Sequence, residues 1–282
     1  MDAKFDRRET PFNGRVAHVS LKGKVEAEEF VEGDAMEVGV PSTAICDQAG
    51  GTRERELILG VGFLTLEKVD CWTFGMAAHD GYVGYVRTSD LKPKSSTETV
   101  VRAVRTYAKA TPHLKTTEPE VRLSFGARLH TGRSEGDWVS TSVGNETLWV
   151  PRKHLGNRNA PFEDPAAVAE LFLHTPYLWG GNTAFGIDCS GLVQAALLAC
   201  GMPCPGDSDQ QEARVGTALP DDAPLQRGDL IFWKGHVAMA LDGATIIHAN
   251  AHHMAVAIEP FEVARKRIEV TGGGLVTSIR RP

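Results

Sequence analysis

The sequence has no long apolar run, no block of lysine and arginine, and no regular set of cysteines. A helix that crosses a bilayer needs about 18–20 consecutive apolar residues, so we expect no membrane-spanning helix. The formal net charge of −6 and the lack of a basic block argue against nucleic acid or an anionic membrane surface as the main partner.

The five cysteines are an odd number and lack the spacings of a disulfide framework, which makes a disulfide scaffold unexpected. Cys200 and Cys204 form one loose pair with no second pair and no suitably spaced histidine. The sequence therefore predicts no metal site and no cofactor. A redox role for these two residues is a distant alternative.

Residues 1–13 are polar and charged and lack the apolar core of a secretory signal. If the numbering starts at the true start codon, a cytoplasmic location is expected. The length of 282 residues suits two or three domains, and 42% apolar with 23% charged residues is typical of globular proteins.

An internal repeat begins after an unassigned segment, residues 1–37, of which residues 25–32 are interpreted as helical. Short apolar runs cut by Gly, Asp and Pro predict strands. Leu57-Ile-Leu-Gly60 resembles Leu123-Ser-Phe-Gly126, and further matches follow at nearly the same offset: Phe63 with Leu129, Trp72 with Trp138, Tyr85-Val86 with Trp149-Val150, and Leu91 with Leu155. The pattern predicts two small all-β barrels, residues 38–95 and 98–157, ahead of a last domain, residues 160–282.

The last domain contains Asp188-Cys-Ser-Gly191, followed by an apolar run that ends at Gly201 and Pro203. This order of signals places Cys189 at the start of a helix. Free amides and the helix dipole stabilise an anion there, so a lowered pKa and a nucleophilic thiolate are expected for Cys189. The alternative is a buried cysteine that acts as a small apolar side chain.

His236 and His248 lie on consecutive predicted strands that flank Asp242-Gly243. Both numbers are even, so the two rings share a face only if the hairpin loop has an odd number of residues. We therefore predict a three-residue loop or a bulge at residues 242–244. His236 is then the base for Cys189 and His248 its orienting partner, with Asn250 in reserve, whereas His252 and His253 are expected to be exposed.

The motifs Tyr177-Leu-Trp-Gly-Gly, Asp188-Cys-Ser-Gly, Arg227-Gly-Asp-Leu-Ile-Phe, Gly235-His-Val and Ile247-His-Ala resemble, in order and spacing, the NlpC-type family of papain-like cell-wall peptidases. The repeated units resemble bacterial SH3-like domains. This resemblance implies an α+β papain-like catalytic domain preceded by two all-β SH3-like barrels. It also implies the catalytic set Cys189, His236 and His248.

The resemblance further implies that Tyr177 lies near the oxyanion and that Asp188 and Ser190 lie near the free amine of the substrate. Trp179, with Phe185 and Phe232, is interpreted as core or pocket lining, with core favoured. The whole chain resembles the cytosolic γ-D-glutamyl-L-diamino-acid endopeptidases that recycle murein peptides.

A murein peptide with a free N-terminal L-alanine is the substrate that follows, with release of a dipeptide. In relatives an acid and a tyrosine of the first SH3-like domain bind the amine. Tyr85 or Tyr82, and Glu54 or Glu56, are the candidates, although Gly60-Val-Gly62 stands where a Gly-Glu pair is common. A murein-peptide binding module with an inert catalytic domain, and an amidase or acyl transferase on the same fold, are the alternatives.

Overall fold

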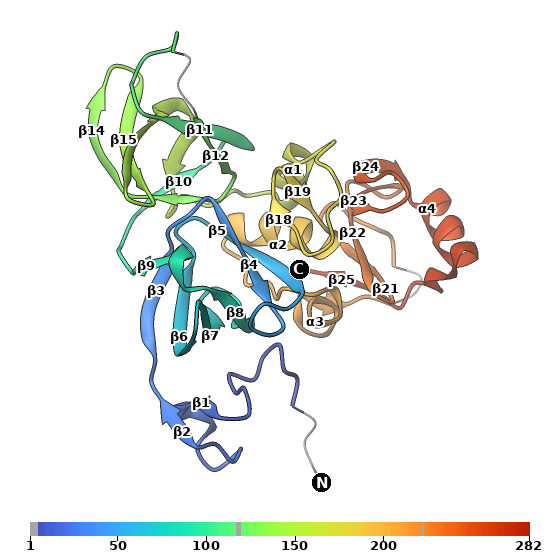
Figure 1. The fold of residues 1–282 in the computed structure, drawn as a ribbon. Helices are drawn as coiled ribbons and strands as arrows, with labels where there is room; N and C mark the ends of the chain where they lie inside the picture. Colours follow the sequence, from blue (N-terminus) through green and yellow to red (C-terminus); the bar gives the residue numbers. More distant parts are fainter. Residues whose placement is uncertain (1–4, 117–119, 221–222) are drawn as a thin grey trace. The chain divides into compact units, whose positions relative to one another are not determined.

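The structure is a computed structural model, and it describes residues 5–116, 120–220 and 223–282. The chain divides into two compact units, Met1–Asn159 and Ala160–Pro282 (Figure 1). The boundary lies between Asn159 and Ala160.

The first barrel is a seven-stranded antiparallel sheet in the order β5-β4-β8-β7-β6-β3-β9. Its interior is apolar and includes Val38, Ile45, Phe63 and Val86. The strands are β3 (Asp34–Val38), β4 (Ser42–Cys46), β5 (Arg53–Ile58), β6 (Gly62–Val69), β7 (Trp72–Ala77), β8 (Val83–Arg87) and β9 (Leu91–Pro93), with the 3-10 helix η2 (Thr88–Asp90) before the last.

The second barrel repeats this strand order with one interruption. Its sheets run β12-β11-β16-β15-β14 and β13-β10-β17, so that β14 and β13 together take the place of β6. Gly60 and Gly126, which the repeat aligns, both have left-handed backbone, with φ of +77° and +80°. The strands are β10 (Thr99–Val101), β11 (Arg105–Lys109), β12 (Glu120–Ser124), β13 (Arg128–Leu129), β14 (Thr131–Glu135), β15 (Trp138–Val143), β16 (Glu146–Pro151) and β17 (Leu155–Asn157), with the 3-10 helix η3 (Arg152–His154).

The turn after β5 joins the two barrels into one unit. Leu59 is buried in the apolar core of the second barrel, and its carbonyl accepts a hydrogen bond from the amide of Arg128 at 2.9 Å. A Cβ atom at Gly60 would lie 2.5 Å from the Arg128 carbonyl oxygen. Glycine is therefore required here for its positive φ and for the close approach of the two backbones.

The N-terminal segment folds onto the first barrel. It contains β1 (Val16–His18), the 3-10 helix η1 (Val19–Leu21) and β2 (Glu29–Val31), and β1 pairs with β2 in parallel. Val16 packs with Phe74 and Val83 on the outside of the barrel. The helix expected at residues 25–32 is wrong, because strand pairing and this apolar contact override local helix propensity.

The C-terminal unit combines four α-helices with a six-stranded antiparallel sheet, in the order β20-β25-β21-β22-β23-β24, among its described residues. Helix α2 contacts α1, β22 and β23, while α4 packs through Ala264 against Trp233 and Ala238 of the sheet. Its elements are α1 (Pro165–Leu171), β18 (Asn182–Thr183), β19 (Gly186–Ile187), α2 (Cys189–Ala199), α3 (Ser208–Arg214), β20 (Thr217–Ala218), β21 (Leu230–Trp233), β22 (His236–Ala240), β23 (Thr245–Asn250), β24 (Ala255–Pro260), α4 (Phe261–Ile268), the π-helix η4 (Glu269–Gly273) and β25 (Ser278–Arg281).

All five cysteines are free thiols. None of the helices in the described ranges is long and apolar enough to cross a membrane.

Candidate active site

Asp188 caps helix α2 and ties it to the preceding loop. Its Oδ1 accepts hydrogen bonds from the amide of Gly191 at 2.7 Å and the hydroxyl of Ser190 at 3.0 Å, and its Oδ2 accepts from the amide of Gly180 at 2.9 Å. The helix thus begins at Cys189, as the stop and start signals predict. Asp188 is thus the N-cap residue of α2.

The glycines of this region let the loop lie directly against the helix start. Gly180 adopts a φ of +68°. A Cβ atom at Gly191 would lie 2.7 Å from the carbonyl oxygen of Gly181. Side chains at these positions would push the loop away from Cys189, so the glycines position the thiol rather than bind a ligand.

Cys189 is the first residue of α2 and is 8% exposed. Its own amide and those of Ser190 and Val237 act on the sulfur and lower the pKa of the thiol. Burial and the neighbouring Asp188 carboxylate outweigh them and raise that pKa to about 12. The expectation of a lowered thiol pKa is wrong, because the sequence indicates the amides but not the depth of burial. The resting site holds a neutral thiol.

The hairpin between β22 and β23 has the predicted odd loop. The Leu241 amide donates to the Thr245 carbonyl at 2.8 Å, which leaves Asp242, Gly243 and Ala244 as the loop. Asp242 stabilises it, because its Oδ1 accepts from the amides of Ala244 and Thr245 at 2.8 Å each. The even-numbered residues of both strands therefore share one face.

His236 and His248 meet on that face. Nε2 of His236 lies 2.8 Å from Nδ1 of His248. The two strands pair only at Met239–Ile247 and Ala240–Ile246, so they are unpaired toward the end that carries His236. Since the Val237 amide acts on the Cys189 sulfur, the thiol lies beside the start of β22.

Both imidazoles are neutral. Burial lowers the pKa of His236 to about 3, with smaller contributions from the neighbouring His248 and from the positive charge of Arg267. Burial also lowers the pKa of His248, against the opposing effect of Glu259. Asn250 is the alternative candidate for the residue that orients His236. Its Oδ1 accepts a hydrogen bond from the backbone amide of the exposed His253 at 2.9 Å.

Sequence reasoning missed a carboxylate and a guanidinium behind His248. Oε1 of Glu259 lies 2.7 Å from Nε2 of His248. Arg267 donates to both carboxylate oxygens, at 2.5 and 2.6 Å. Burial alone would raise the pKa of Glu259, but the hydrogen bonds from Arg267 and His248 hold it well below its usual value. Strand alternation is the signal in the sequence that could have found Glu259. When β24 pairs with β23, the side chain of residue 259 lies on the same face of the sheet as His248.

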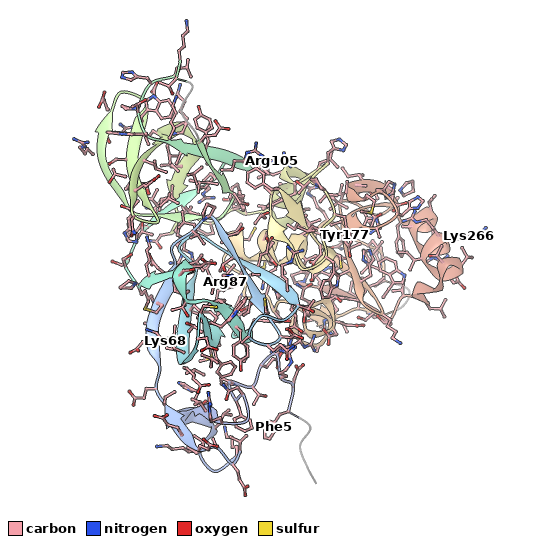
Figure 2. All side chains as sticks on the ribbon, viewed as in Figure 1. Phe5, Lys68, Arg87, Arg105, Tyr177 and Lys266 are labelled. Carbon is pink, nitrogen blue, oxygen red and sulfur yellow. The ribbon has the colours of Figure 1, made fainter. Side chains whose placement is uncertain are left out.

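Tyr177 lies on the loop before β18 and is labelled in Figure 2. Burial raises the pKa of Tyr177 to about 12, with smaller contributions from the neighbouring Cys189 and Asp188. The phenol is therefore protonated and can donate a hydrogen bond. Ser190 is buried and donates its hydroxyl to Asp188.

Trp179 is 58% exposed and does not belong to the core. The core interpretation is wrong, because backbone hydrogen bonds of Tyr177 and Leu178 hold this loop at the surface, where most of the Trp179 side chain is exposed. Phe232, in contrast, is fully buried in β21.

The candidates from the first barrel have partners inside the N-terminal unit. Tyr85 stacks on Phe74 with ring centroids 5.1 Å apart, and Tyr82 is buried in the barrel core. Glu54 forms an ion pair with Arg7 at 2.5 Å. A contact of Tyr85 or Glu54 with substrate stays a prediction.

Within the described ranges, one group of histidine, cysteine and acidic side chains could gather around a metal ion: His248, His253 and Glu259. Both ring nitrogens of His248 are already hydrogen bonded, to His236 and to Glu259. A metal there would have to displace one of these two hydrogen bonds of His248.

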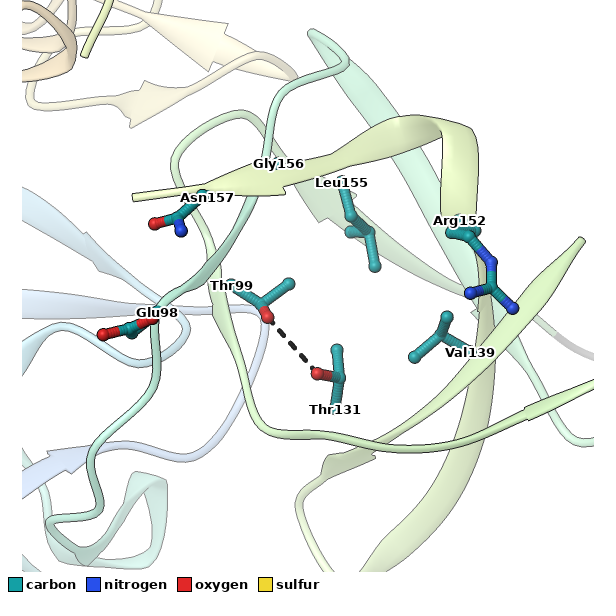
Figure 3. A pocket seen from close by; sticks show the side chains of 8 residues that line it. All are labelled: Glu98, Thr99, Thr131, Val139, Arg152, Leu155, Gly156 and Asn157. Atoms are coloured by element: carbon teal, nitrogen blue, oxygen red, sulfur yellow. Dashed lines mark hydrogen bonds between the residues drawn. The ribbon is translucent and has the colours of Figure 1, made fainter. Parts of the chain in front are cut away.

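A hollow of about 300 Å³ lies in the second barrel (Figure 3). Thr99 and Thr131 face each other there, with their hydroxyls 3.2 Å apart, and Arg152 and Leu155 form part of the rim. Its lining has no cysteine and no histidine, so it offers no thiol and imidazole pair.

A thiol at a helix start beside a strand that carries an imidazole is the arrangement of a papain-like cysteine hydrolase. Comparison with family models identifies residues 174–267 as an NlpC/P60 family domain and residues 45–91 as a bacterial dipeptidyl-peptidase SH3 domain. The C-terminal unit therefore contains an NlpC/P60 domain, and the N-terminal unit contains a bacterial dipeptidyl-peptidase SH3 domain. The predicted papain-like fold and the presence of an SH3-like domain are confirmed.

Among curated relatives, a γ-D-glutamyl-L-lysine dipeptidyl-peptidase of Bacillus subtilis is 30% identical over 183 residues, which is 60% of each chain. A protein of the same name from Bacillus cereus is 38% identical over 106 residues, or 35% of this chain and 31% of the relative. Dipeptidyl-peptidase 6 of Lysinibacillus sphaericus is 36% identical over 98 residues, or 35% of this chain and 36% of the relative. The chain thus matches 60% or less of the length of these relatives.

The crystal structure of an NlpC/P60 family protein from Bacillus cereus superposes with a TM-score of 0.70. It covers 88% of this chain and 99% of that one at 19% identity. This likeness supports the fold.

Proposed function

We propose that the protein is a cysteine peptidase that hydrolyses the γ-D-glutamyl–L-diamino acid bond of murein peptides with a free N-terminal L-alanine. The product is then the dipeptide L-Ala-γ-D-Glu. The observation that carries the chemistry is the buried thiol of Cys189 among three amides, beside the strand that holds the hydrogen-bonded His236–His248 pair. The substrate class is supported by the names of the curated relatives.

Cys189 acts as the nucleophile and His236 as the base. His236 accepts the thiol proton while the sulfur attacks the γ-glutamyl carbonyl carbon, because neither group is charged at rest. The tetrahedral oxyanion accepts hydrogen bonds from the Cys189 amide and the Tyr177 hydroxyl. Its collapse breaks the C–N bond, and His236 gives the proton to the leaving amine.

The acyl-enzyme is then hydrolysed. Water gives one proton to His236 as its oxygen attacks the thioester carbonyl, and the proton returns to the sulfur when the C–S bond breaks. The free γ-carboxyl group of the dipeptide and the neutral thiol are the products. His248 keeps the His236 ring in place through both halves of the reaction.

Recognition of the substrate amine is assigned to Asp188 with Ser190. The Ser190 hydroxyl proton is already used by Asp188, so Ser190 can only accept a hydrogen bond, which suits an ammonium group. Trp179 offers an exposed indole beside Tyr177 for the peptide chain. For Glu54 and Tyr85 a contact with the substrate rests on the resemblance alone, and in the structure Glu54 pairs with Arg7.

The second barrel is proposed to be a second SH3-like domain, because its strand order repeats that of the first. A cytoplasmic role in the recycling of murein peptides is the corresponding cellular proposal. No nucleic acid, membrane, metal or cofactor takes part in the proposed reaction.

The test is mass spectrometry of the products from a defined set of murein peptides. We expect L-Ala-γ-D-Glu from L-Ala-γ-D-Glu-L-Lys or from its diaminopimelate analogue, and no product with Cys189→Ala. N-acetylated tripeptide should not be cleaved. Equal turnover of free and acetylated peptide would remove the requirement for a free amine, and tight binding without turnover by the wild type would favour the inert binding module.

A further inference from the structure

Two residues, Glu259 and Arg267, lie behind the pair of imidazoles. Four side chains from four elements form one hydrogen-bonded series: His236 on β22, His248 on β23, Glu259 on β24 and Arg267 on α4. The side chains of His248 and Glu259 are buried. A series of this kind fixes proton positions, since each nitrogen must be either donor or acceptor.

Arg267 determines the state of the carboxylate. Its two terminal nitrogens donate to the two oxygens of Glu259 at 2.5 and 2.6 Å. A guanidinium has donors only, so both oxygens must accept, and Glu259 is an anion.

The anion in turn sets the tautomer of His248. Oε1 of Glu259 can only accept, so Nε2 of His248 carries its hydrogen. A neutral imidazole has one hydrogen, which leaves Nδ1 of His248 as an acceptor. Nε2 of His236 lies 2.8 Å away and must donate to it.

We propose, on the basis of the proposed peptidase function, that Glu259 is a positioning residue which acts through His248 to hold His236 with its hydrogen on Nε2 and its free lone pair on Nδ1. That lone pair is the acceptor for the thiol proton. Arg267 anchors the carboxylate. When His236 becomes an imidazolium, the negative charge of Glu259 stabilises it across His248.

A loss of the Glu259 charge has a defined effect. In Glu259→Gln the amide has one acceptor and one donor where three N–H groups converge. Either the amide nitrogen faces Arg267, or it faces His248 and reverses both tautomers, so that Nδ1 of His236 carries the hydrogen. Both outcomes weaken His236 as a base.

The first experiment needs no variant. Nitrogen-15 chemical shifts of the imidazoles in the full-length wild type, at neutral pH, report which ring nitrogen carries hydrogen. We expect Nε2 protonated and Nδ1 unprotonated for both His236 and His248. The opposite tautomer at either residue overturns the proposal.

The second experiment measures the rate constant for alkylation of Cys189 by iodoacetamide at pH 7, by mass spectrometry of the peptide that contains it, together with kcat and KM on the tripeptide. Glu259→Gln should lower both the alkylation rate and kcat by about 10–100-fold, with KM nearly unchanged. The matched control is Glu262→Gln, which breaks an exposed ion pair with Arg265 in the same helix α4. It should leave both rates at the wild-type value.

A double-variant cycle separates positioning from general damage. If Glu259 acts through His248, Glu259→Gln has no further effect on alkylation in the His248→Ala background. Equal losses in both backgrounds, or a wild-type alkylation rate in Glu259→Gln, overturn the proposal.

Alkylation and tautomers are measured without peptide, so they stand apart from the proposed substrate. If the murein peptides are not cleaved while the tautomers and the alkylation losses hold, the substrate fails and the positioning role survives. If peptides are cleaved and Glu259→Gln alkylates like the wild type, the positioning role alone fails.

Discussion

The site has a helix half, which holds Cys189, and a strand half, which holds His236, and each half keeps its reacting group neutral through different surroundings. The helix half surrounds the sulfur of Cys189 with backbone amides and one carboxylate, Asp188. The strand half surrounds His236 with a second imidazole and an ion pair of Glu259 and Arg267. Burial raises the pKa of the thiol in the first half and lowers the pKa of the imidazole in the second. The resting thiol and imidazole are therefore both neutral, and charge appears only when a proton moves from sulfur to nitrogen.

The largest change comes from the helix half. Cys189→Ala removes the only nucleophile in the proposed reaction, and we expect peptide hydrolysis to fall at least about 10⁴-fold while the thermal midpoint stays near that of the wild type. Product analysis by mass spectrometry and a melting curve measure the two quantities. Residual hydrolysis above about 1% of the wild-type rate would show that a residue other than Cys189 is the nucleophile.

Tyr177→Phe tests the proposed oxyanion donor of the Tyr177 side chain. The phenol is protonated because its pKa is raised to about 12, so it can donate to the oxyanion at any ordinary pH. Loss of one such donor is expected to lower kcat by about 10²–10³-fold with little change in KM. A fall in kcat/KM that comes from KM alone would assign Tyr177 to substrate binding instead.

Asp188→Asn separates the role of Asp188 as helix cap from the effect of its negative charge on the thiol. Asparagine can still accept from Gly191, but its amide nitrogen then faces the amide of Gly180. We expect a loss of about 1–3 kcal/mol in the free energy of unfolding from the buried, unmatched donors. The thiol pKa should fall, because the carboxylate that helps to raise it is gone.

Asp164→Asn is the matched control, since Asp164 caps α1 through the amide of Ala166 with a partly exposed side chain. Its loss of stability should be smaller than that of Asp188→Asn, and the alkylation rate of Cys189 should not change. Equal losses for the two variants in urea titrations would contradict the special burial of Asp188.

The smallest effect expected is a pH dependence that comes from the strand half. His236 has a pKa of about 3 in the folded protein and about 6.5 when unfolded, so the unfolded chain binds more protons between these values. The stability contribution is complete above pH 6.5 and is lost as pH falls toward 3. His248 and Glu259, whose pKa values are also lowered, add losses in the same direction.

Urea titrations of the wild type and of His236→Asn at pH 7 and pH 4.5 measure the His236 share. The wild type should lose more stability between the two pH values than the variant does. Equal losses would show that His236 is not held neutral in the folded protein. The midpoint of the fall in kcat/KM at low pH should likewise lie below pH 6.5.

Local signals predict the parts of this molecule that depend on local chemistry. The helix start at Cys189 follows from a cap and a pair of stop residues, and the shared face of His236 and His248 follows from counting the residues of one hairpin. The strand order that the two barrels share follows from the spacing of the repeat.

The other features depend on tertiary packing. The raised thiol pKa of Cys189 depends on burial that no neighbouring residue in the sequence reveals. Glu259 becomes a partner of His248 only when β24 pairs with β23, and Arg267 only when α4 folds back onto the sheet. The segment at residues 25–32 forms a strand because β1 pairs with it.

The loop of Asp242, Gly243 and Ala244 restricts how this chain can change in evolution. An insertion or deletion of one residue would turn every side chain of β23 to the opposite face and carry His248 away from His236. Length changes at this hairpin are compatible with hydrolysis only in steps of two. A survey of descendants of this gene should therefore find loops of odd length here, and even-length loops only beside a lost cysteine or histidine.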